Sequence, residues 1–375
     1  MVKVGITGQA GFIGTHLFNT LSLHKEDFEL VPSKDEFFSS STSLENFVIH
    51  CDVIVHLAAM NRHNDPKVIY STNIEIVQKL ISALENTNSK AHVLFSSSSQ
   101  EDNDNPYGKS KKEGRILLSN WAKKNGGGFT GLIIPNVFGP FGLPNYNSVV
   151  ATFSHKLNHN ETPKILTDAE LKLIYVDELV QQIIAWIKEY KQNQVISEVR
   201  VPHTVEKKVS EILALLKNYK EQYVEQNIIP SLKSMFEINL FNTFRCYMDI
   251  KNHYPVHYVQ HVDDRGKFVE IIRINDGGQV SFSTIKPGIT RGDHFHTRKI
   301  ERFSVIKGKA LIQLRKIGTD KVIEFILSGE ESSFVDMPIW YTHNIKNIGD
   351  DDLYTIFWIN EFYDPKDPDT FILEV

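Results

Sequence analysis

Residues 1–16 read MVKVGITGQAGFIGTH, and this stretch is the strongest indication of the fold of the first half of the chain. Val2–Thr7 is an apolar run that predicts a β-strand, and a glycine-rich turn follows it at once. Apolar residues then recur through Phe12–Leu23 with the spacing of an amphipathic helix. The order strand, glycine turn, helix predicts the start of a βαβ unit.

The glycines of this turn are Gly8, Gly11 and Gly14. Small residues let a turn approach a pyrophosphate closely, and the N-terminus of a helix offers it free N–H groups and a positive dipole end. We therefore predict that these glycines, with Phe12 and Ile13 between them, bind a dinucleotide cofactor. The alternative is a turn with a purely structural role.

Short apolar runs and helical periods continue to alternate along the first half of the chain. The run at Val53–Leu57 is apolar almost throughout, as a parallel strand buried on both faces requires. This alternation predicts an α/β, doubly wound parallel sheet of the Rossmann type. The other expected elements are strands at Phe28–Val31, Val93–Phe95 and Gly131–Ile134 and helices at Ile74–Leu84 and Tyr107–Trp121.

The sequence changes in character after about residue 245, where helical periods disappear. Short apolar runs separated by turn signals predict an all-β sandwich or barrel. We place the first domain at residues 1–246, a linker at 247–256 and the barrel at 257–375. The helical-looking segments Val205–Tyr223 and Ile229–Asn239 are expected to complete the first domain, and Ser39–Ser43 is expected to be a loop.

The 375 residues have an ordinary globular composition, with 41% hydrophobic and 23% charged residues. The net charge of −5 gives no general attraction to nucleic acid or to an anionic membrane. Cys51 and Cys246 form no CxxC pair, which favours a reducing, cytoplasmic location. We expect no signal peptide and no membrane span, because the chain has no apolar run of about 18 residues.

Tyr107 and Lys111 form a Tyr-x-x-x-Lys pair on an expected helix. Residues i and i+4 share a helix face, so both side chains can enter one pocket. A tyrosine is a poor acid or base at neutral pH until a nearby ammonium stabilises its phenolate, so the pair predicts catalytic proton transfer. Tyr247 and Lys251 have the same spacing, but no serine-ending strand precedes them, and we expect that pair to be structural.

The GxxGxxG spacing, the strand Asp52–Ala59 and the segment Pro135–Pro140 together resemble the extended short-chain dehydrogenase/reductase family. This resemblance implies that Asn136 contacts a nucleotide-sugar. It also implies cofactor contacts from Leu57, Ala58, Ala59, Asn73 and Lys111, with Asn73 opening the helix that follows.

The same resemblance implies that a serine of Ser96–Ser99 hydrogen-bonds the substrate oxygen. The third, Ser98, is expected in this role, with Ser97 and Ser99 as alternatives. Sugar 4,6-dehydratases of the family have Thr-Asp-Glu here, whereas this chain reads Ser98-Ser99-Gln100. Reduction of a ketone is therefore expected rather than dehydration.

The choice between NAD and NADP depends on the residues just past the second strand, Ser33, Lys34 and Asp35. Ser33 and Lys34 suit the 2′-phosphate of NADP, whereas Asp35 would suit the ribose hydroxyls of NAD. We predict NADPH, with NAD as the alternative.

Residues 288–308 fit the first motif of the cupin superfamily, G(x)5HxH(x)4E(x)6G, without a gap. The second motif is partial, because Trp340 and Ser332 replace its usual glycines. Two histidines at i and i+2 of a strand lie on one face, and a glutamate and a distant histidine complete a four-ligand set. We predict one divalent metal per chain, zinc first and nickel, manganese or iron as alternatives, rather than a surface cluster. The expected ligands are His294, His296, Glu301 and His343.

Residues 263–270 and 291–294 also resemble the dTDP-sugar 3,5-epimerases of the same superfamily, which are metal-free. In that reading His294 is the catalytic base and Arg291 contacts the substrate. His294 is therefore either a metal ligand or a base, and both roles suit proton abstraction next to a carbonyl.

The whole chain resembles the bifunctional capsular-polysaccharide enzymes of the CapF type. The resemblance implies that the barrel epimerises C3 of UDP-2-acetamido-2,6-dideoxy-hexos-4-ulose. The first domain then reduces C4 to give UDP-2-acetamido-2,6-dideoxy-L-talose, on the route to N-acetyl-L-fucosamine. It also implies a homodimer. The alternatives are a single-function nucleotide-sugar 4-epimerase or dehydrogenase with a structural barrel, and a non-enzymatic dinucleotide sensor.

Overall fold

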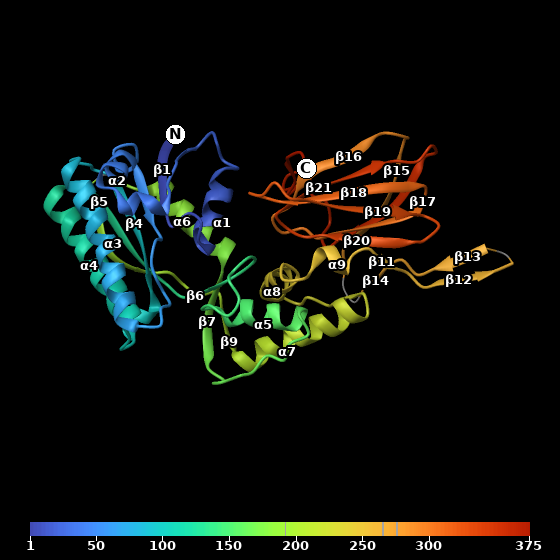
Figure 1. Cartoon of the computed structure of the whole chain (residues 1–375), viewed down its shortest axis with the longest axis horizontal. Coiled ribbons are helices and arrows are strands. Elements are labelled where there is room, and N and C mark those ends of the chain that lie inside the picture. The colour runs from blue at the N-terminus through green and yellow to red at the C-terminus, as the bar shows by residue number, and fades with distance from the viewer. Residues whose placement is uncertain (192, 265, 275–276) are drawn as a thin grey trace. The chain divides into compact units, whose positions relative to one another are not determined.

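The computed structural model describes residues 1–191, 193–264, 266–274 and 277–375. The chain forms two compact units, which Figure 1 shows as the blue-to-green and the mainly yellow-to-red parts. The first unit consists of residues 1–152 and 165–212, and the second of residues 153–164 and 213–375. The proposed linker at residues 247–256 stays a prediction about where the two functions divide.

The first unit is built on a six-stranded parallel sheet with the order β2-β1-β3-β4-β5-β8. The order reverses between β1 and β3, and in open α/β sheets ligands bind at such a switch point. Thr7 is in register with His56, so the carboxyl ends of β1 and β3 lie side by side. The strands are β1 Val2–Thr7, β2 Phe28–Val31, β3 Val53–His56, β4 His92–Ser98, β5 Gly128–Ile134 and β8 Val195–Arg200.

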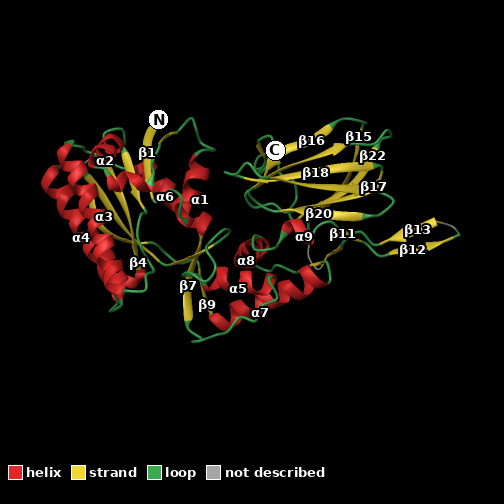
Figure 2. Cartoon of the chain, in the orientation of Figure 1, coloured by secondary structure: helices red, strands yellow, loops and turns green. Residues whose placement is uncertain are grey.

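Helices cover both faces of this sheet, as Figure 2 shows in red. On β3, Val53 and Val55 pack in one core with α1 and α6, whereas Ile54 packs in a second core with α2, α3 and α4. Two cores of this kind confirm the predicted α/β, doubly wound fold. The helices are α1 Phe12–Leu21, α2 Ser41–Val48, α3 Pro66–Asn86, α4 Pro106–Asn125 and α6 Val176–Glu189.

Three predictions of local structure are wrong. Val205–Lys208 forms strand β9 and pairs with β7, Glu170–Tyr175, so only Val209–Tyr219 forms the helix α7. Helix α8 spans Met235–Arg245 and begins after Ser234, whose hydroxyl caps it. Ser39–Ser43 is no loop, because it enters α2 with Ser40 as the capping residue. The remaining elements of this region are β6 Asn136–Phe138, α5 Val149–Asn158 and β10 Ile228–Ile229.

The second unit contains two five-stranded sheets that confirm the predicted all-β cupin-like barrel. One sheet has the order β11-β20-β17-β22-β15 and the other the order β19-β18-β21-β16-β23, and all their pairings are antiparallel. Buried side chains from both sheets form one core. The strands of the first sheet are β11 Val256–His257, β15 Gln279–Ile285, β17 Glu301–Lys307, β20 Ser333–Met337 and β22 Leu353–Ile359. Those of the second are β16 Thr290–Phe295, β18 Lys309–Lys316, β19 Val322–Ser328, β21 Tyr341–Asn347 and β23 Phe371–Ile372.

Helical segments pack on this barrel within the second unit. They are the π-helical turn Lys220–Glu225, helix α8 and helix α9, Ile250–His253. Ile250 and Tyr254 belong to the barrel's core, so the chain between residues 213 and 254 folds with the barrel. A hairpin of β12 Gln260–Asp263 and β13 Gly266–Val269 and a short strand β14 Arg273–Ile274, which pairs with β10, complete the unit.

Candidate functional sites

The glycine turn of the first unit meets the end of β3. Gly8 has a left-handed backbone with φ of +70°, and a Cβ there would lie 2.8 Å from the backbone nitrogen of Ala58. A Cβ on Gly14 would lie 2.2 Å from the carbonyl oxygen of Gly8. Side chains at these two positions would separate the turn from β3 and from α1, so glycine is required at both.

Gly11 is the N-cap residue of α1 and, because it has no side chain, it cannot cap the helix with a side-chain hydrogen bond. Phe12 and Ile13 are the first residues of the helix, where backbone N–H groups are left for an anion. Leu57 donates its backbone N–H to the carbonyl of Thr7 at 3.1 Å, which holds the β3 end beside the turn. The fold thus brings the predicted cofactor residues from two strand ends together.

Of the residues expected to select NAD or NADP, Ser33 and Lys34 follow β2, and Asp35 is the first residue of a 3-10 turn, Asp35–Ser39. Lys34 and Asp35 are exposed, and Ser33 is half-buried. All three lie beyond the carboxyl end of β2, the expected side for the adenosine ribose. Their placement is compatible with either cofactor.

Tyr107 lies in the first turn of α4, and Lys111 lies one turn later on the same face. The Lys111 Nζ is 5.9 Å from the centre of the Tyr107 ring and donates to the carbonyl of Ser96 at 2.7 Å. Burial lowers the pKa of Lys111 to about 8 and raises the pKa of Tyr107 to about 12. The two side chains therefore lie close together, as the spacing predicted, and burial is the main cause of the raised pKa of the phenol.

The serines at the end of β4 differ in their partners. Ser97 is buried and donates its hydroxyl to Glu101, which is paired with Arg115 at 2.7 Å. Ser98 is half-buried and accepts the backbone N–H of Gln100 at 3.2 Å, whereas Ser99 is exposed. Of the three candidates, Ser98 is the one that combines partial burial with a hydroxyl hydrogen left to donate.

Asn73 joins the segment that follows β3 to helix α4. Its side chain accepts from the backbone N–H of Met60 at 2.7 Å and donates to the Met60 carbonyl and to the Ser110 hydroxyl. Ser110 in turn donates to the carbonyl of Tyr107 at 2.7 Å. Asn73 does not open its helix as predicted, because α3 begins at Pro66, but it does lie between the predicted sites.

A loop that sequence reasoning missed lies close to Tyr107. Arg62 donates to the carbonyls of Asn145 and Tyr146, and Asn147 donates to the carbonyl of Asn61 at 3.3 Å. The loop at residues 141–148 is therefore clamped to the segment that follows β3, and Tyr146 adds to the raised pKa of Tyr107. No motif marks these contacts, because they join residues more than eighty positions apart.

Asn136, the predicted nucleotide-sugar contact, is exposed at the start of β6. Tyr247 and Lys251 do not share a helix, because Tyr247 follows α8 and Lys251 lies in α9. The spacing there places no pair on one helix face.

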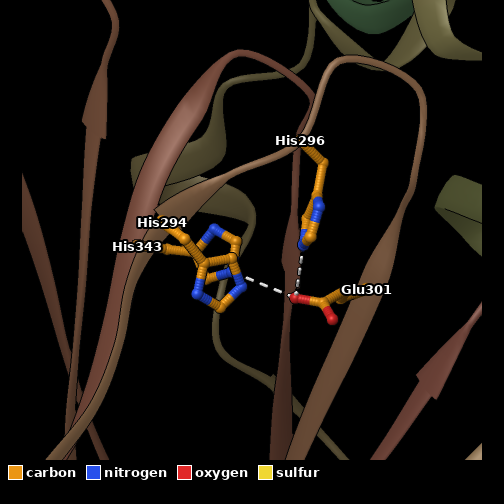
Figure 3. A group of neighbouring side chains, drawn as sticks. All are labelled: His294, His296, Glu301 and His343. Carbon is orange, nitrogen blue, oxygen red and sulfur yellow. Dashed lines mark hydrogen bonds and ion pairs between the residues drawn. The ribbon is translucent and has the colours of Figure 1, made fainter. Parts of the chain in front are cut away.

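The four predicted metal ligands meet inside the barrel of the second unit (Figure 3). Three strands or their ends supply them, and their ligand atoms all lie within 4.8 Å of one another. The Oε2 atom of Glu301 is 3.0 Å from the Nε2 of His343 and 3.3 Å from the Nε2 of His296. His296, Glu301 and His343 are buried, so the cluster is no surface group of histidines.

Backbone carbonyls hold two of these rings in place. The Nδ1 of His296 contacts the carbonyl of Asp369, and the Nδ1 of His343 contacts the carbonyl of Tyr341 at 3.1 Å. A carbonyl only accepts, so both Nδ1 atoms carry hydrogen and both Nε2 atoms face the cluster as possible ligands. His296 Nε2 is buried without hydrogen-bond geometry to any described residue, which leaves it for another partner.

The charges of the cluster also suit a cation. Burial raises the pKa of the Glu301 carboxyl, but His296 and His343 outweigh burial and hold the pKa well below its usual range. Burial and the neighbouring histidines lower the pKa of His294 to about 4, which leaves the ring neutral at pH 7. Three imidazoles and one carboxylate form a donor set that fits zinc or another divalent transition metal.

Arg291 reaches the same inner face of β16 through a bulge. The strand is irregular between Gly292 and His294, and Asp293 has a φ of 56°. Because of the extra residue, Arg291 and His294 face the same side although they are three positions apart. Arg291 is exposed, which is compatible with the predicted substrate contact. Arg265, part of the resemblance to the sugar epimerases, lies outside the described residues.

No helix in the described part of the chain is long and apolar enough to cross a membrane.

The fold and the two sites define a nicotinamide-dependent enzyme of the epimerase/reductase class joined to a cupin-like domain. Residues 4–199 match the NAD dependent epimerase/dehydratase family, and residues 261–371 match the polysaccharide biosynthesis C-terminal domain. The chain belongs to the CapF-type family of capsular polysaccharide proteins, which combines these two domains.

Two similar proteins align with the full length of the chain, and a third aligns with part of it. The UDP-2-acetamido-2,6-beta-L-arabino-hexul-4-ose reductase of Pseudomonas aeruginosa is 32% identical over 100% of this chain and 99% of its own length. The crystal structure of the capsular polysaccharide assembling protein CapF from Staphylococcus aureus is 37% identical, covers 100% of both chains and has a TM-score of 0.63. UDP-glucose 4-epimerase of Thermotoga maritima, 22% identical over 58% of this chain and 82% of its own, shares the fold with a TM-score of 0.51.

Proposed function

We propose that this chain is a bifunctional enzyme that acts on a UDP-linked 4-keto-6-deoxy amino sugar. The barrel inverts C3 of UDP-2-acetamido-2,6-dideoxy-hexos-4-ulose, and the first unit reduces C4 with NADPH. The product is UDP-2-acetamido-2,6-dideoxy-L-talose, used for N-acetyl-L-fucosamine in capsule or O-antigen. The observation that carries this proposal is the presence in one chain of a Tyr107/Lys111 pair on one helix face and of a mainly buried cluster of three histidines and a glutamate.

Chemistry fixes the order of the two steps. The C3 proton of the sugar is acidic only while C4 is a ketone, because the carbanion is stabilised as an enolate. Reduction of C4 removes that stabilisation. Epimerisation must therefore come first, and a single chain with both sites can complete the sequence.

In the reduction, NADPH supplies a hydride to C4 when it is bound. Tyr107 donates the phenol proton to the C4 oxygen as that oxygen gains charge, and solvent returns a proton to Tyr107 afterwards. Ser98 donates a hydrogen bond to the same oxygen. Lys111, held by the carbonyl of Ser96, keeps a positive charge in the pocket and favours the phenolate that Tyr107 becomes.

In the epimerisation, a divalent metal at His296, Glu301 and His343 would act as a Lewis acid toward the 4-keto oxygen. His294 is either a fourth ligand or the base that removes the C3 proton, and solvent then returns a proton to the opposite face of C3, which inverts that carbon and restores the ketone. The His294 ring is neutral at pH 7 because burial depresses its pKa, and this suits both roles. Arg291, exposed on the same strand face, supports binding of the UDP-sugar by its charge.

The proposal includes NADPH rather than NADH, zinc as the metal, a homodimer and a cytoplasmic location. A second candidate is a reductase alone with a structural barrel, favoured by the printed name of the Pseudomonas aeruginosa relative, which mentions only reduction. The third candidate is a dinucleotide sensor. The complete sets of predicted catalytic and metal-binding residues argue against it.

One mixture separates the three candidates. The protein is incubated with NADPH and the UDP-4-keto sugar, and the products are analysed for the configuration of C3 and C4. We expect NADPH oxidation and a product inverted at C3. Oxidation with C3 retained would favour the reductase alone, and no oxidation would favour the sensor.

A further inference from the structure

The segment just before β23 is hydrogen-bonded to the loop that follows His296. This loop, residues 297–299, connects β16 to β17 and so links two metal ligands, His296 and Glu301. Asp369, just before β23, contacts every residue of the loop. It is only 4% exposed although it carries a carboxylate.

The Asp369 carboxylate accepts four hydrogen bonds from the loop. Oδ1 accepts from the backbone N–H of Thr297 at 3.1 Å and from its hydroxyl at 2.6 Å. Oδ2 accepts from the backbone N–H groups of Arg298 and Lys299, each at 3.0 Å. Three successive N–H groups converge on one anion, so the carboxylate determines the conformation of the loop.

The backbone carbonyl of the same residue accepts from His296 Nδ1. This contact fixes the rotation of the imidazole and leaves Nε2 directed at the cluster, 3.3 Å from Glu301. Asp369 thus holds the ring through its main chain and the adjoining loop through its side chain.

Two basic side chains of the loop, Lys299 and Arg298, also bind the segment at residues 361–369. Lys299 is 3% exposed and donates its ammonium to the carbonyl of Pro368 at 2.7 Å. Arg298 pairs with Glu361 and Asp367. The segment 361–369 therefore has several anchors on the loop, of which Asp369 is the buried one.

We propose that Asp369 is the positioning residue for the metal ligand His296, and that residues 361–369 form a latch that sets the metal affinity of the barrel. Asp369 binds no metal itself and belongs to neither cupin motif. The proposal rests on the metal centre in the proposed function. It goes beyond that function by assigning metal retention to a segment far from the ligands in sequence.

The test measures Zn²⁺ affinity by competition with a chromophoric chelator, together with the Tm of metal-free and Zn²⁺-loaded protein. In Asp369→Asn, an amide N–H₂ group would face the backbone N–H groups of residues 297–299, which need an acceptor. Because this disturbs the loop that holds His296, we expect the affinity for Zn²⁺ to fall about 10–100-fold. The gap in Tm between loaded and metal-free protein should narrow, because ligand stabilisation depends on the dissociation constant. Asp320→Asn, which neutralises an exposed carboxylate in the turn between β18 and β19 and outside the segment 361–369, is the matched control and should keep its affinity within about twofold.

A residue with a merely structural role would lower both Tm values equally and leave the affinity unchanged, and that result would overturn the proposal. If Asp369→Asn does not fold, Thr297→Val provides the test. This variant removes one hydrogen-bond donor to Asp369 and should also weaken Zn²⁺ binding, but by a smaller factor. Wild-type affinity in that variant would contradict the latch. Wild-type protein that takes up no Zn²⁺ would overturn the metal centre itself, which is a separate failure.

Discussion

At the scale of single residues, burial decides the behaviour of the titratable groups around the first unit's pocket. Spacing predicted that Lys111 would favour the phenolate of Tyr107, yet burial raises the pKa of Tyr107 to about 12. The reason is that burial removes water from the phenol and so disfavours its charged form, and Tyr146 adds to the shift. Tyr107 thus stays protonated at neutral pH, which is compatible with its proposed role as a proton donor.

We expect Tyr107→Phe to lower the rate of substrate-dependent NADPH oxidation by about 10²–10⁴-fold, the usual effect of losing a general acid. Dinucleotide binding should survive, because the glycine turn and the end of β3 do not involve the phenol. Steady-state kinetics and a fluorescence titration with NADPH measure the two effects. Tyr247→Phe is the matched control, and a near-normal rate in Tyr107→Phe would remove this residue from the mechanism.

His56 offers a test of the pH dependence of stability. It is fully buried between Thr7 and Phe95, and burial lowers its pKa from 6.5 to about 3, with Lys111 adding to the shift. Between these two values the unfolded chain binds the proton and the folded chain does not. Stability from this group is therefore present above pH 6.5 and is lost as the pH falls toward 3.

We expect His56→Gln to reduce the pH dependence of the free energy of unfolding. The change in slope corresponds to at most one proton, or about 1.4 kcal/mol per pH unit between pH 6 and 4. Glutamine can keep a hydrogen bond to Thr7 but does not titrate. Urea unfolding followed by hydrogen exchange of the β3 peptide measures the slope in the first unit. An unchanged slope would mean that His56 is protonated in the folded protein.

At the scale of elements, the sequence predicted those whose signal is local. The strand–turn–helix start could be read from residues close together, and the four residues of the His/Glu cluster could be read from one complete and one partial cupin motif. Val205–Lys208 could not, because it is a strand only through pairing with β7. The role of Asp369 is invisible for the same reason, since it lies 73 positions from His296. Ser40 was misread because a serine favours both turns and helix caps.

The loop at residues 141–148 is an element whose position depends on one clamp. Arg62 donates to two of its carbonyls. We expect Arg62→Ala to raise the KM for the UDP-sugar about tenfold, in keeping with the loss of charge-assisted hydrogen bonds at a partly exposed site. The KM for NADPH should change less, because the glycine turn is untouched.

Steady-state kinetics with each substrate varied in turn measure this difference. Lys79→Ala, which removes an exposed cation from α3, is the control. Equal changes in both KM values would show that the effect of Arg62 is not confined to the loop at residues 141–148.

At the scale of the molecule, the second unit is held together by a buried charged cluster. Arg302 of β17 pairs with Asp336 of β20 at 2.8 Å, and Tyr223 donates its hydroxyl to the same carboxylate. Arg245 of α8 donates to the Tyr223 hydroxyl at 2.9 Å. Burial opposes ionisation of Asp336, but Arg302 outweighs burial and lowers the pKa of the carboxyl. The cluster joins the helical segments to the barrel, so a fragment ending near Pro255 would lose Asp336.

We expect Asp336→Asn to destabilise the second unit by about 3–5 kcal/mol, because it leaves two buried guanidinium groups with no carboxylate. Urea unfolding followed by hydrogen exchange of the β17 and β20 peptides measures the loss. Glu270→Gln, which breaks an exposed pair with Arg273, should cost less than about 1 kcal/mol. A similar small cost for Asp336→Asn would show that the cluster is not what holds the helices to the barrel.

We propose that the barrel inverts C3 and that the first unit reduces C4. The most direct measurement is proton exchange at C3 of the UDP-4-keto sugar in deuterated water, followed by NMR, in protein that cannot complete the reduction. We expect Tyr107→Phe to incorporate deuterium at C3 at about the wild-type rate, because proton abstraction there depends on the barrel. His294→Ala should abolish the exchange, whether His294 binds the metal or acts as the base. Exchange that is lost in Tyr107→Phe and persists in His294→Ala would contradict the claim and leave the barrel a structural role.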